Sequence, residues 1–246
     1  MSTESTPRIA VVTGGGSGLG RVIATALLAA GHRVVVAGRT SASLEDVPGA
    51  DPFVADVIDA AAVTALFDHV SARYGRLDLL VNNAGVFGRG APVAEVSDED
   101  WQAVVDTNLT GSFRCARAAF RLMAAQDPRG GRIINNGSIS AHVPRPYAVG
   151  YTATKHAITG LTKALALEGR AHDIAVCQLD IGNAASDMTA AMSSGTPQAD
   201  GTLRPEPVMD AVHVGDMVAH MAALPLSANV QFVTLMATTM PYIGRG

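Results

Sequence analysis

Short, continuous apolar runs alternate along this chain with longer segments whose apolar residues recur three and four positions apart. Runs rich in Val and Ile, without polar alternation, are typical of parallel strands covered on both faces. They predict strands at residues 8–13, 32–40, 52–57, 77–81, 131–138, 174–180 and 230–236. The helical periodicity between them predicts helices at residues 19–30, 59–74, 101–126, 150–171 and 213–224. Such alternation predicts an α/β fold, a doubly wound parallel sheet of about seven strands with helices on both faces, in three α/β/α layers.

One segment departs from this pattern. Residues 183–207 show neither periodicity and contain two glycines and three prolines. A long irregular segment in a compact domain is usually a lid or a binding loop, although a disordered segment without function has the same appearance. No repeat or change in composition divides the chain. We therefore expect a single domain over residues 1–246, with a substrate loop or lid at about 183–207.

Composition and charge narrow the range of partners. Of the 246 residues, 48% are hydrophobic and 16% are charged, which is enough for a buried core. A net charge of -4 gives no electrostatic reason to expect nucleic acid or an anionic membrane as a partner. The first residues lack a signal-peptide pattern, and no apolar run approaches the ~18 residues of a membrane-spanning helix. We expect a cytoplasmic protein.

The residues that commonly bind metals are scattered along the sequence. Cys115 and Cys177 lie far apart and are expected to be buried free thiols. The seven histidines form no paired motif, so no metal site is expected.

A glycine-rich turn directly follows the first predicted strand and precedes the first helix. Gly14, Gly18 and Gly20 form the spacing Gly-x-x-x-Gly-x-Gly. Glycines in this position allow the backbone to approach a ligand at the positive end of a helix, which suits a pyrophosphate. A flexible turn has the same spacing, but the position between strand and helix favours a nucleotide site in a Rossmann-like sheet.

The second predicted strand ends at Arg39, where such a fold places the adenosine ribose. Sites that select NAD have an Asp or Glu here, whereas an arginine can bind the 2′-phosphate of NADP. Ser17, inside the glycine loop, supplies no second positive charge. The position favours NADP(H) over NAD(H), and a solvated surface arginine is the alternative.

The residues with the most distinctive chemistry are Tyr151 and Lys155. Four residues apart in a helix, they lie on neighbouring turns of one face. A nearby ammonium favours phenolate and is expected to lower the pKa of the tyrosine, so that it can exchange a proton with a carbonyl or alcohol. Ser138 follows a predicted strand and emerges at the sheet edge that also carries the glycine loop. Taken alone, the Tyr-x-x-x-Lys spacing also fits an ordinary helix surface. Asn108, inside a predicted helix, is either a mild defect or the mark of a bend or water site.

Together these features resemble the single-domain branch of the short-chain dehydrogenase/reductase family. The resemblance rests on Thr13-Gly14-x-x-x-Gly18-x-Gly20, Asn82-Asn83-Ala84-Gly85, Asn108, Ser138 and Tyr151-x-x-x-Lys155, in this order. It implies an NAD(P)-dependent oxidoreductase that transfers a hydride between NADP(H) and a carbonyl or secondary alcohol. The alternatives are a nucleotide-sensing protein without turnover on the same fold and an NAD-preferring dehydrogenase. An enoyl reductase is disfavoured, because those enzymes usually space the Tyr and Lys more widely.

The resemblance also implies roles for individual residues. Tyr151 exchanges the proton, Lys155 lowers its pKa and holds the nicotinamide ribose, and Ser138 orients the substrate oxygen. Asn108 distorts its helix and holds a water that links Lys155 to solvent. The cofactor-binding residues implied are Gly14, Ser17, Gly18, Leu19, Gly20, Arg39, Asp56, Val57, Asn82, Ala84, Gly85, Tyr151, Lys155, Gly182, Ala184 and Ser186. The subunits of such proteins pair their Asn108 and Tyr151 helices, so a homotetramer is expected, with a dimer as the next alternative.

The substrate is the least defined part of this interpretation. The expected substrate contacts are Ser140, His142, Pro144, Tyr147, Met188 and Met192. This set is mostly apolar, with Arg145 as the only nearby cation, and it favours a hydrophobic or medium-sized ketone. For His142, a packing role is an equal alternative.

Two segments depart from the family's pattern. Ile181-Gly182 stands where a proline and a glycine are common, so the loop after the sixth strand is expected to start at a different angle. The apolar C-terminal segment is expected to be buried against the body of the protein or a second subunit.

Overall fold

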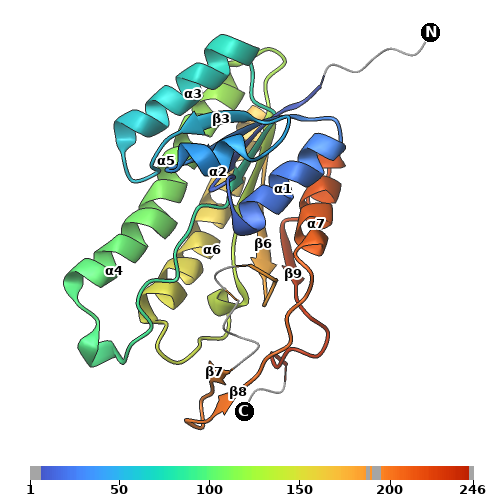
Figure 1. The fold of residues 1–246 in the computed structure, drawn as a ribbon. Helices are drawn as coiled ribbons and strands as arrows, with labels where there is room; N and C mark the ends of the chain where they lie inside the picture. The colour runs from blue at the N-terminus through green and yellow to red at the C-terminus, as the bar shows by residue number, and fades with distance from the viewer. Residues whose placement is uncertain (1–6, 187–188, 190–194, 244–246) are drawn as a thin grey trace.

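A computed structural model describes residues 7–186, 189 and 195–243 of the chain. Within these residues, seven parallel strands form one sheet in the order β3-β2-β1-β4-β5-β6-β9 (Figure 1). Their bounds are β1 Ile9–Thr13, β2 Arg33–Gly38, β3 Asp51–Val54, β4 Leu79–Asn82, β5 Gly131–Asn136, β6 Ile174–Ile181 and β9 Phe232–Leu235. β1 pairs with both β2 and β4, so the order of the strands reverses at β1. This confirms the predicted α/β fold.

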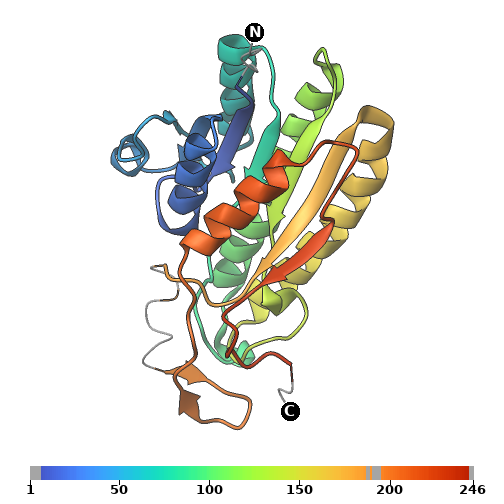
Figure 2. The same cartoon turned by 90° about the vertical axis from the view of Figure 1, so that its right-hand side faces the viewer.

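Helices cover both faces of this sheet. Their bounds are α1 Gly18–Ala29, α2 Ser41–Glu45, α3 Ala60–Tyr74, α4 Asp98–Val105, α5 Ser112–Ala125, α6 Val149–Gly169 and α7 Val212–Ala223. Helices α1 and α7 lie side by side on one face, and α3, α5 and α6 cover the other (Figures 1 and 2). The short helix α2 follows β2 and was not expected from periodicity.

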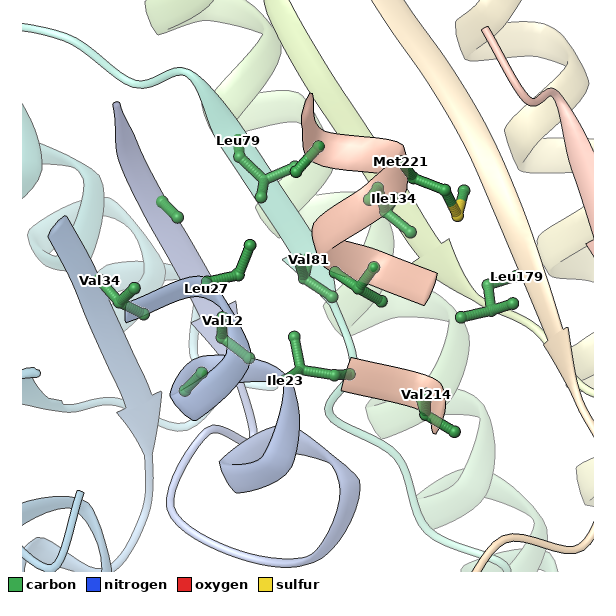
Figure 3. Close-up of a cluster of buried hydrophobic side chains, with 14 of the residues drawn as sticks. Val12, Ile23, Leu27, Val34, Leu79, Val81, Ile134, Leu179, Val214 and Met221 are labelled. Atoms are coloured by element: carbon green, nitrogen blue, oxygen red, sulfur yellow. The ribbon is translucent and has the colours of Figure 1, made fainter. Parts of the chain in front are cut away.

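Each central strand contributes to two hydrophobic cores because successive side chains point to opposite faces. In β1, Val12 packs with Ile23 of α1 and Val214 of α7, as Figure 3 shows. Its neighbour Val11 packs on the other side, in the cluster that contains Leu66 of α3. Double coverage explains why these strands are apolar at nearly every position rather than at every second one.

The two cysteines belong to different cores. Cys177 packs on the α1 and α7 face and Cys115 on the α3 and α5 face, so the sheet separates them. Burial raises the pKa of Cys115 to about 12 and that of Cys177 to about 11. Both are buried free thiols, as predicted, and neither carries the thiolate that reactive cysteines need.

The predicted helix 101–126 is interrupted in the structure. It begins at Asp98, where the Ser97 side chain accepts a hydrogen bond from the Asp100 amide, and it widens into a π-helical segment over Asp106–Gly111. Asn108 lies in this segment. The sequence therefore located a real irregularity, and such π-helical turns are frequent at functional sites.

The irregular segment after β6 contains a short antiparallel pair, β7 Thr196–Pro197 with β8 Leu203–Arg204. Gly201, with φ of +79°, forms part of the connecting turn, a conformation that favours glycine. The pair projects beyond the carboxyl ends of the strands (Figures 1 and 2). The expected absence of regular structure over 183–207 was therefore wrong for this part. Met188 and Met192 lie outside the described residues.

The C-terminal segment is buried at Met240 and exposed at Ile243. Met240 is buried, and its sulfur accepts a hydrogen bond from the Asn183 amide at 3.4 Å, which confirms burial of this part against the body. Ile243 is 90% exposed, so the expectation of burial within this chain fails at that residue.

Membrane-spanning helices and clusters of metal-binding side chains are both absent from the described residues. No helix in this part of the chain is long and apolar enough to cross a membrane. No group of three or more His, Cys, Asp or Glu residues there is arranged to hold a metal ion.

Candidate active site

A cavity of about 430 Å³ lies at the carboxyl edge of the sheet. A crevice is expected there because the connections from β1 and β4 leave the edge on opposite sides. Most of the predicted site residues line it, namely Gly14, Ser17, Gly18, Leu19, Gly20, Arg39, Asp56, Val57, Ala84, Gly85, Ser138, Ser140, Tyr151, Lys155, Gly182, Ala184 and Ser186. Residues separated by more than 170 positions in the sequence therefore meet around one space.

The glycine loop is braced against the end of β4. The Thr13 hydroxyl accepts hydrogen bonds from the Asn83 and Ala84 amides, at 3.0 and 3.1 Å. In return, the Asn83 side-chain amide donates to the Thr13 carbonyl at 3.0 Å. The Ser17 side chain does not cap α1, so the first turn of the helix keeps N–H groups for a ligand at the cavity.

The backbone here is too close to tolerate side chains. Gly14 has φ of +63°, and a Cβ on Gly20 would lie 2.0 Å from the Gly14 carbonyl oxygen. An uncapped helix end behind a glycine-rich loop fits the pyrophosphate of a dinucleotide.

Replacement of Gly20 with alanine should weaken binding of NADPH by about tenfold or more, because the backbone must move to accommodate the new methyl group. Calorimetric titration of both proteins with NADPH measures this. Gly160→Ala on α6 is the matched control. A Cβ there meets no atom within 4 Å beyond its chain neighbours and the helix's own backbone, so binding should be unchanged. Equal affinity of the Gly20 variant and the parent would contradict the assignment of this loop.

Arg39 lies at the cavity where its β2 segment leaves the sheet. Its side chain is exposed, and among the described residues it has no ion-pair or hydrogen-bond partner. Asp56 and Val57 line the cavity from the segment after β3. β3 ends at Val54, three residues before the predicted end at residue 57. Its last hydrogen bond to β2 is donated by the Ala55 amide to the Gly38 carbonyl, at 2.9 Å.

Asn82 was an expected cofactor contact, but the next residue, Asn83, lines the cavity in its place. Asn82 is buried, and its amide nitrogen donates to the Asn135 side chain and the Ser112 carbonyl, both at 3.0 Å. The amide of Asn82 is thus used within the core, and its neighbour Asn83 lines the cavity instead. The alternation of side chains along a strand decides which of two adjacent asparagines faces the site.

Tyr151 and Lys155 lie one turn apart near the start of α6, as predicted. The Lys155 Nζ lies 5.5 Å from the centroid of the Tyr151 ring and donates to the Asn136 carbonyl at 2.7 Å. The tyrosine ring also contacts Phe87, with a centroid separation of 5.1 Å. Sequence reasoning missed Phe87, which follows β4 and has no motif of its own.

The electrostatics of this pair differ from expectation. Burial raises the pKa of Tyr151, and the Ser138 hydroxyl and the Arg145 charge only partly oppose this effect. The predicted net lowering of the Tyr151 pKa was wrong for this structure, because the effect of burial exceeds the effects that lower it, and Lys155 is not among their sources. Burial also lowers the pKa of Lys155 to about 8, and the charge of Asp180 acts in the opposite direction.

Ser138 follows β5 at the cavity. Its amide donates to the Asp180 carboxylate at 3.0 Å rather than to a strand, which explains why β5 ends at Asn136 and not at the predicted Ser138. Its hydroxyl oxygen accepts a hydrogen bond from the Ser140 amide at 3.1 Å. The hydroxyl can also donate its own proton, either to the Tyr151 oxygen or to another acceptor in the cavity.

Asn108 holds part of the cavity wall in place through hydrogen bonds to the backbone of Val86. Its side chain accepts from the Val86 amide at 2.8 Å and donates to the Val86 carbonyl at 2.9 Å. A longer bond, of 3.3 Å, joins it to Thr154 on α6. Asn108 therefore fixes the segment after β4 that lines the cavity, and its expected water-binding role stays a prediction.

The expected substrate residues are distributed unevenly. Ser140 is buried and lines the cavity, whereas His142, Pro144 and Tyr147 are exposed and are not among the described residues that line it. His142 instead contacts Asp180, with 2.8 Å between Nε2 and Oδ2. The packing alternative for His142 thus fits the structure better than direct substrate contact.

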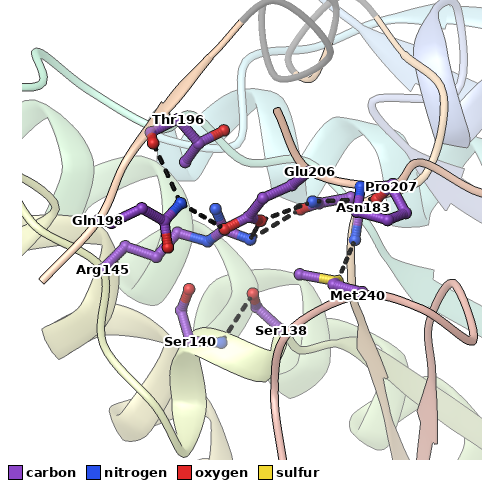
Figure 4. A network of polar contacts seen from close by, with 9 residues as sticks. All are labelled: Ser138, Ser140, Arg145, Asn183, Thr196, Gln198, Glu206, Pro207 and Met240. Carbon is purple, nitrogen blue, oxygen red and sulfur yellow. Dashed lines mark hydrogen bonds and ion pairs between the residues drawn. The ribbon is translucent and has the colours of Figure 1, made fainter. Parts of the chain in front are cut away.

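A buried ion pair joins the loop after Ser138 to the segment before α7. Arg145 and Glu206 approach to 2.6 Å, and their side chains are 7% and 1% exposed. Asn183 and Gln198 complete the network through hydrogen bonds to Glu206 of 2.9 and 3.0 Å (Figure 4). Burial alone would raise the pKa of Glu206, but these hydrogen bonds and the Arg145 charge lower it. The sequence predicts a cation at Arg145 but not its partner, because no local pattern links positions 145 and 206.

Comparison with known proteins places this site in a family. The family model for short chain dehydrogenase matches residues 8–197. A 3beta-hydroxysteroid dehydrogenase of Mediterraneibacter gnavus is 40% identical over 169 residues, 65% of this chain and 60% of that protein. A 3-oxoacyl-[acyl-carrier-protein] reductase of Synechocystis is 36% identical over 76% of this chain and 78% of its own length.

The solved structures agree with this assignment. A variant of the actinorhodin polyketide ketoreductase, crystallised with NADPH, has a TM-score of 0.83 and 31% identity, with coverage of 94% of this chain and 96% of that chain. A 3-ketoacyl-(acyl-carrier-protein) reductase of Brucella melitensis, crystallised with NADH, has a TM-score of 0.82 and 25% identity over the same shares. Matches of this extent show common ancestry as well as a common fold. This chain therefore belongs to the short-chain dehydrogenase/reductase family and is an NAD(P)-dependent oxidoreductase.

Proposed function

We propose that this enzyme transfers a hydride between NADP(H) and a ketone or secondary alcohol, with Tyr151 as the proton-exchanging group. The observation that carries the proposal is that Tyr151, Ser138 and Lys155 line the same cavity as the braced glycine loop. A bound nicotinamide supplies or accepts the hydride. The remaining chemistry belongs to the side chains of this protein.

Each of these side chains has a distinct task. The Tyr151 hydroxyl gives a proton to the carbonyl oxygen during reduction and takes it back during oxidation. The raised pKa keeps the phenol protonated at neutral pH, which suits it as the acid. The Ser138 hydroxyl donates a hydrogen bond to the same oxygen, where negative charge develops. Lys155, one turn from Tyr151, would hold the nicotinamide ribose.

The activity itself is tested by mixing the enzyme with NADPH or NADH and a panel of ketones, and following loss of the reduced cofactor. Suitable compounds follow the named relatives: a 3-oxoacyl thioester, a 3-ketosteroid and a polyketide-like cyclic ketone. Turnover of at least one ketone, or oxidation of the matching alcohol, is the expected result. Tight nucleotide binding with no turnover in either direction would contradict the proposal and favour a nucleotide-sensing role.

The preference for NADP rests on Arg39. Replacement with serine should reduce the ratio of kcat/KM for NADPH to that for NADH by about 10- to 100-fold, because a charged hydrogen bond to the 2′-phosphate is lost. Arg33→Ser is the matched control, since Arg33 is an exposed arginine at the opposite end of β2. If the ratio of kcat/KM for NADPH to that for NADH is unchanged in the Arg39 variant, the arginine does not bind the 2′-phosphate.

Domain organisation, assembly and location extend the same proposal. Residues 1–246 act as one domain, with 183–207 as the substrate loop, and the Arg145–Glu206 pair supports a fixed position for part of that loop. The protein is proposed to be cytoplasmic.

A homotetramer is the proposed assembly, and a dimer is the next alternative. Exposed apolar side chains at Trp101 on α4 and Phe113 on α5 support helix pairing between subunits. A monomer in light scattering would contradict the assembly.

A further inference from the structure

A buried carboxylate lies directly behind the proposed active site. Asp180, near the end of β6, is 1% exposed and does not line the cavity among the described residues. It accepts three hydrogen bonds: from the Ser138 amide at 3.0 Å, from Gln178 Nε2 at 2.7 Å and from the His142 ring at 2.8 Å. A buried charge is costly unless it is paired in this way, so the arrangement requires an explanation.

The bonds from Ser138 and His142 fix the two ends of one short turn. These residues flank a single 3-10 turn, Ile139–Ala141, which also contains the Ser140 amide that bonds the Ser138 hydroxyl. Asp180 Oδ1 accepts from the first end of the turn and Oδ2 contacts the second. Both the backbone and the hydroxyl of Ser138 are therefore oriented through this carboxylate.

The third bond connects the turn to the helix that carries Tyr151. Gln178 accepts from the Thr162 hydroxyl at 3.1 Å and donates to the Thr159 hydroxyl at 3.0 Å, and both threonines are on α6. Space around the carboxylate is tight, since a Cβ on Gly137 would lie 2.0 Å from Asp180 Oδ1. The distance between the two halves of the site is thus held by a continuous chain of buried hydrogen bonds.

The same carboxylate acts on Lys155 through charge. Burial lowers the pKa of Lys155 to about 8, and Asp180 is the charged group that raises it. Tyr151, on the same helix, also lies near Lys155, and the charge of Arg145 acts on Tyr151. Asp180 therefore helps to keep the ammonium protonated near neutral pH.

We infer that Asp180 and His142 form a positioning pair for the proposed hydride transfer, in which the carboxylate holds the Ser138 turn at a fixed distance from α6 and His142 secures its outer end. The inference rests on the proposed function. Neither residue touches the reacting atoms. His142, with a side chain that is 41% exposed, acts through Asp180 rather than on the substrate.

Steady-state kinetics of Asp180→Asn with NADPH and a ketone that the parent reduces tests the pair. Asparagine keeps one acceptor oxygen for the Ser138 amide, but its nitrogen cannot accept from His142. The Ser138 turn is then held at one end only, and kcat should fall by about 10- to 100-fold. The alkaline limb of the pH profile should also move to lower pH, since Lys155 loses the charge that supports its protonated form. A purely structural role would lower stability without moving this limb.

Three further variants keep the test decisive if Asp180→Asn folds poorly. His142→Leu should lose rate as well, whereas His142→Gln, which keeps a donor of similar reach, should retain most of it. Asp78→Asn is the matched control, because Asp78 is also a mostly buried carboxylate that accepts a backbone N–H, from Ile9 at 2.8 Å, but at the opposite edge of the sheet. Equal rates and pH profiles for His142→Leu and the parent, or equal losses in Asp78→Asn, would overturn the inference.

A second readout does not depend on turnover. Amide hydrogen exchange over residues 138–147 should be several-fold faster in Asp180→Asn and His142→Leu than in the parent, and unchanged in Asp78→Asn. If the parent reduces no ketone, the proposed function fails, and the exchange rates still decide whether the pair holds the turn. Unchanged exchange in both variants would overturn the positioning role.

Discussion

Replacing Tyr151 with phenylalanine should lower kcat for ketone reduction by about 10²- to 10⁴-fold, the usual contribution of a positioned proton donor. Only the hydroxyl is removed, and the ring contact with Phe87, at 5.1 Å between centroids, can remain. Binding of NADPH should therefore change little. Single-turnover measurement of the hydride step, combined with calorimetric titration of the cofactor, separates the two effects.

Tyr74→Phe is a suitable control for this experiment. Its hydroxyl is also bonded, to Asp51 at 2.9 Å, but it lies on α3 away from the cavity. The control should keep the parent's rate. Equal rates for Tyr151→Phe and the parent would rule out Tyr151 as the proton-exchanging group and with it the proposed mechanism.

Replacing Lys155 with methionine should have two opposite effects: kcat/KM falls by about 10²-fold or more, while the folded protein becomes more stable at neutral pH. The first effect follows if Lys155 positions the cofactor and the phenol. The second follows from burial, because Lys155 is only 6% exposed and its pKa falls from the ordinary 10.5 to about 8. A lysine with this environment destabilises the fold while it is charged.

The pH dependence of this effect has a defined sign. Below about pH 8 the lysine is protonated in both the folded and the unfolded chain, so the full cost of burying the charge, about 3 kcal/mol, is present. Between pH 8 and 10.5 the unfolded chain binds the proton more strongly, and the cost declines as pH rises. The methionine variant should therefore exceed the parent in free energy of unfolding at pH 7 and match it above about pH 10.5.

Denaturant unfolding of both proteins at a series of pH values measures this difference. The bond from Lys155 to the Asn136 carbonyl is also lost in the variant, so about 3 kcal/mol is an upper value. Lys163→Met on the same helix is the control, because Lys163 is exposed and should show no such pH-dependent gain. A methionine variant that is less stable than the parent at every pH would contradict the assigned cost of the buried charge.

The sequence alone was sufficient for the features that depend on local pattern. Strands covered on both faces need apolar residues at nearly every position, so β1 and its neighbours could be read directly. The glycine loop and the Tyr151–Lys155 spacing are also local, since a turn or a single helical face determines them. At Asn108 the local pattern left a mild defect and a bend as alternatives, and only the family resemblance implied the helix distortion that the π-helical segment shows.

Tertiary structure decided what depends on the orientation and burial of side chains. Only the pleat of β4 shows that Asn83, and not Asn82, lines the cavity. The direction of the Tyr151 pKa depends on how strongly the ring is enclosed, and spacing along a helix does not reveal that. The contacts of Arg145 with Glu206 and of His142 with Asp180 join residues 61 and 38 positions apart. Such partners are chosen by how loops pack over the sheet edge, and no period in the sequence encodes that choice.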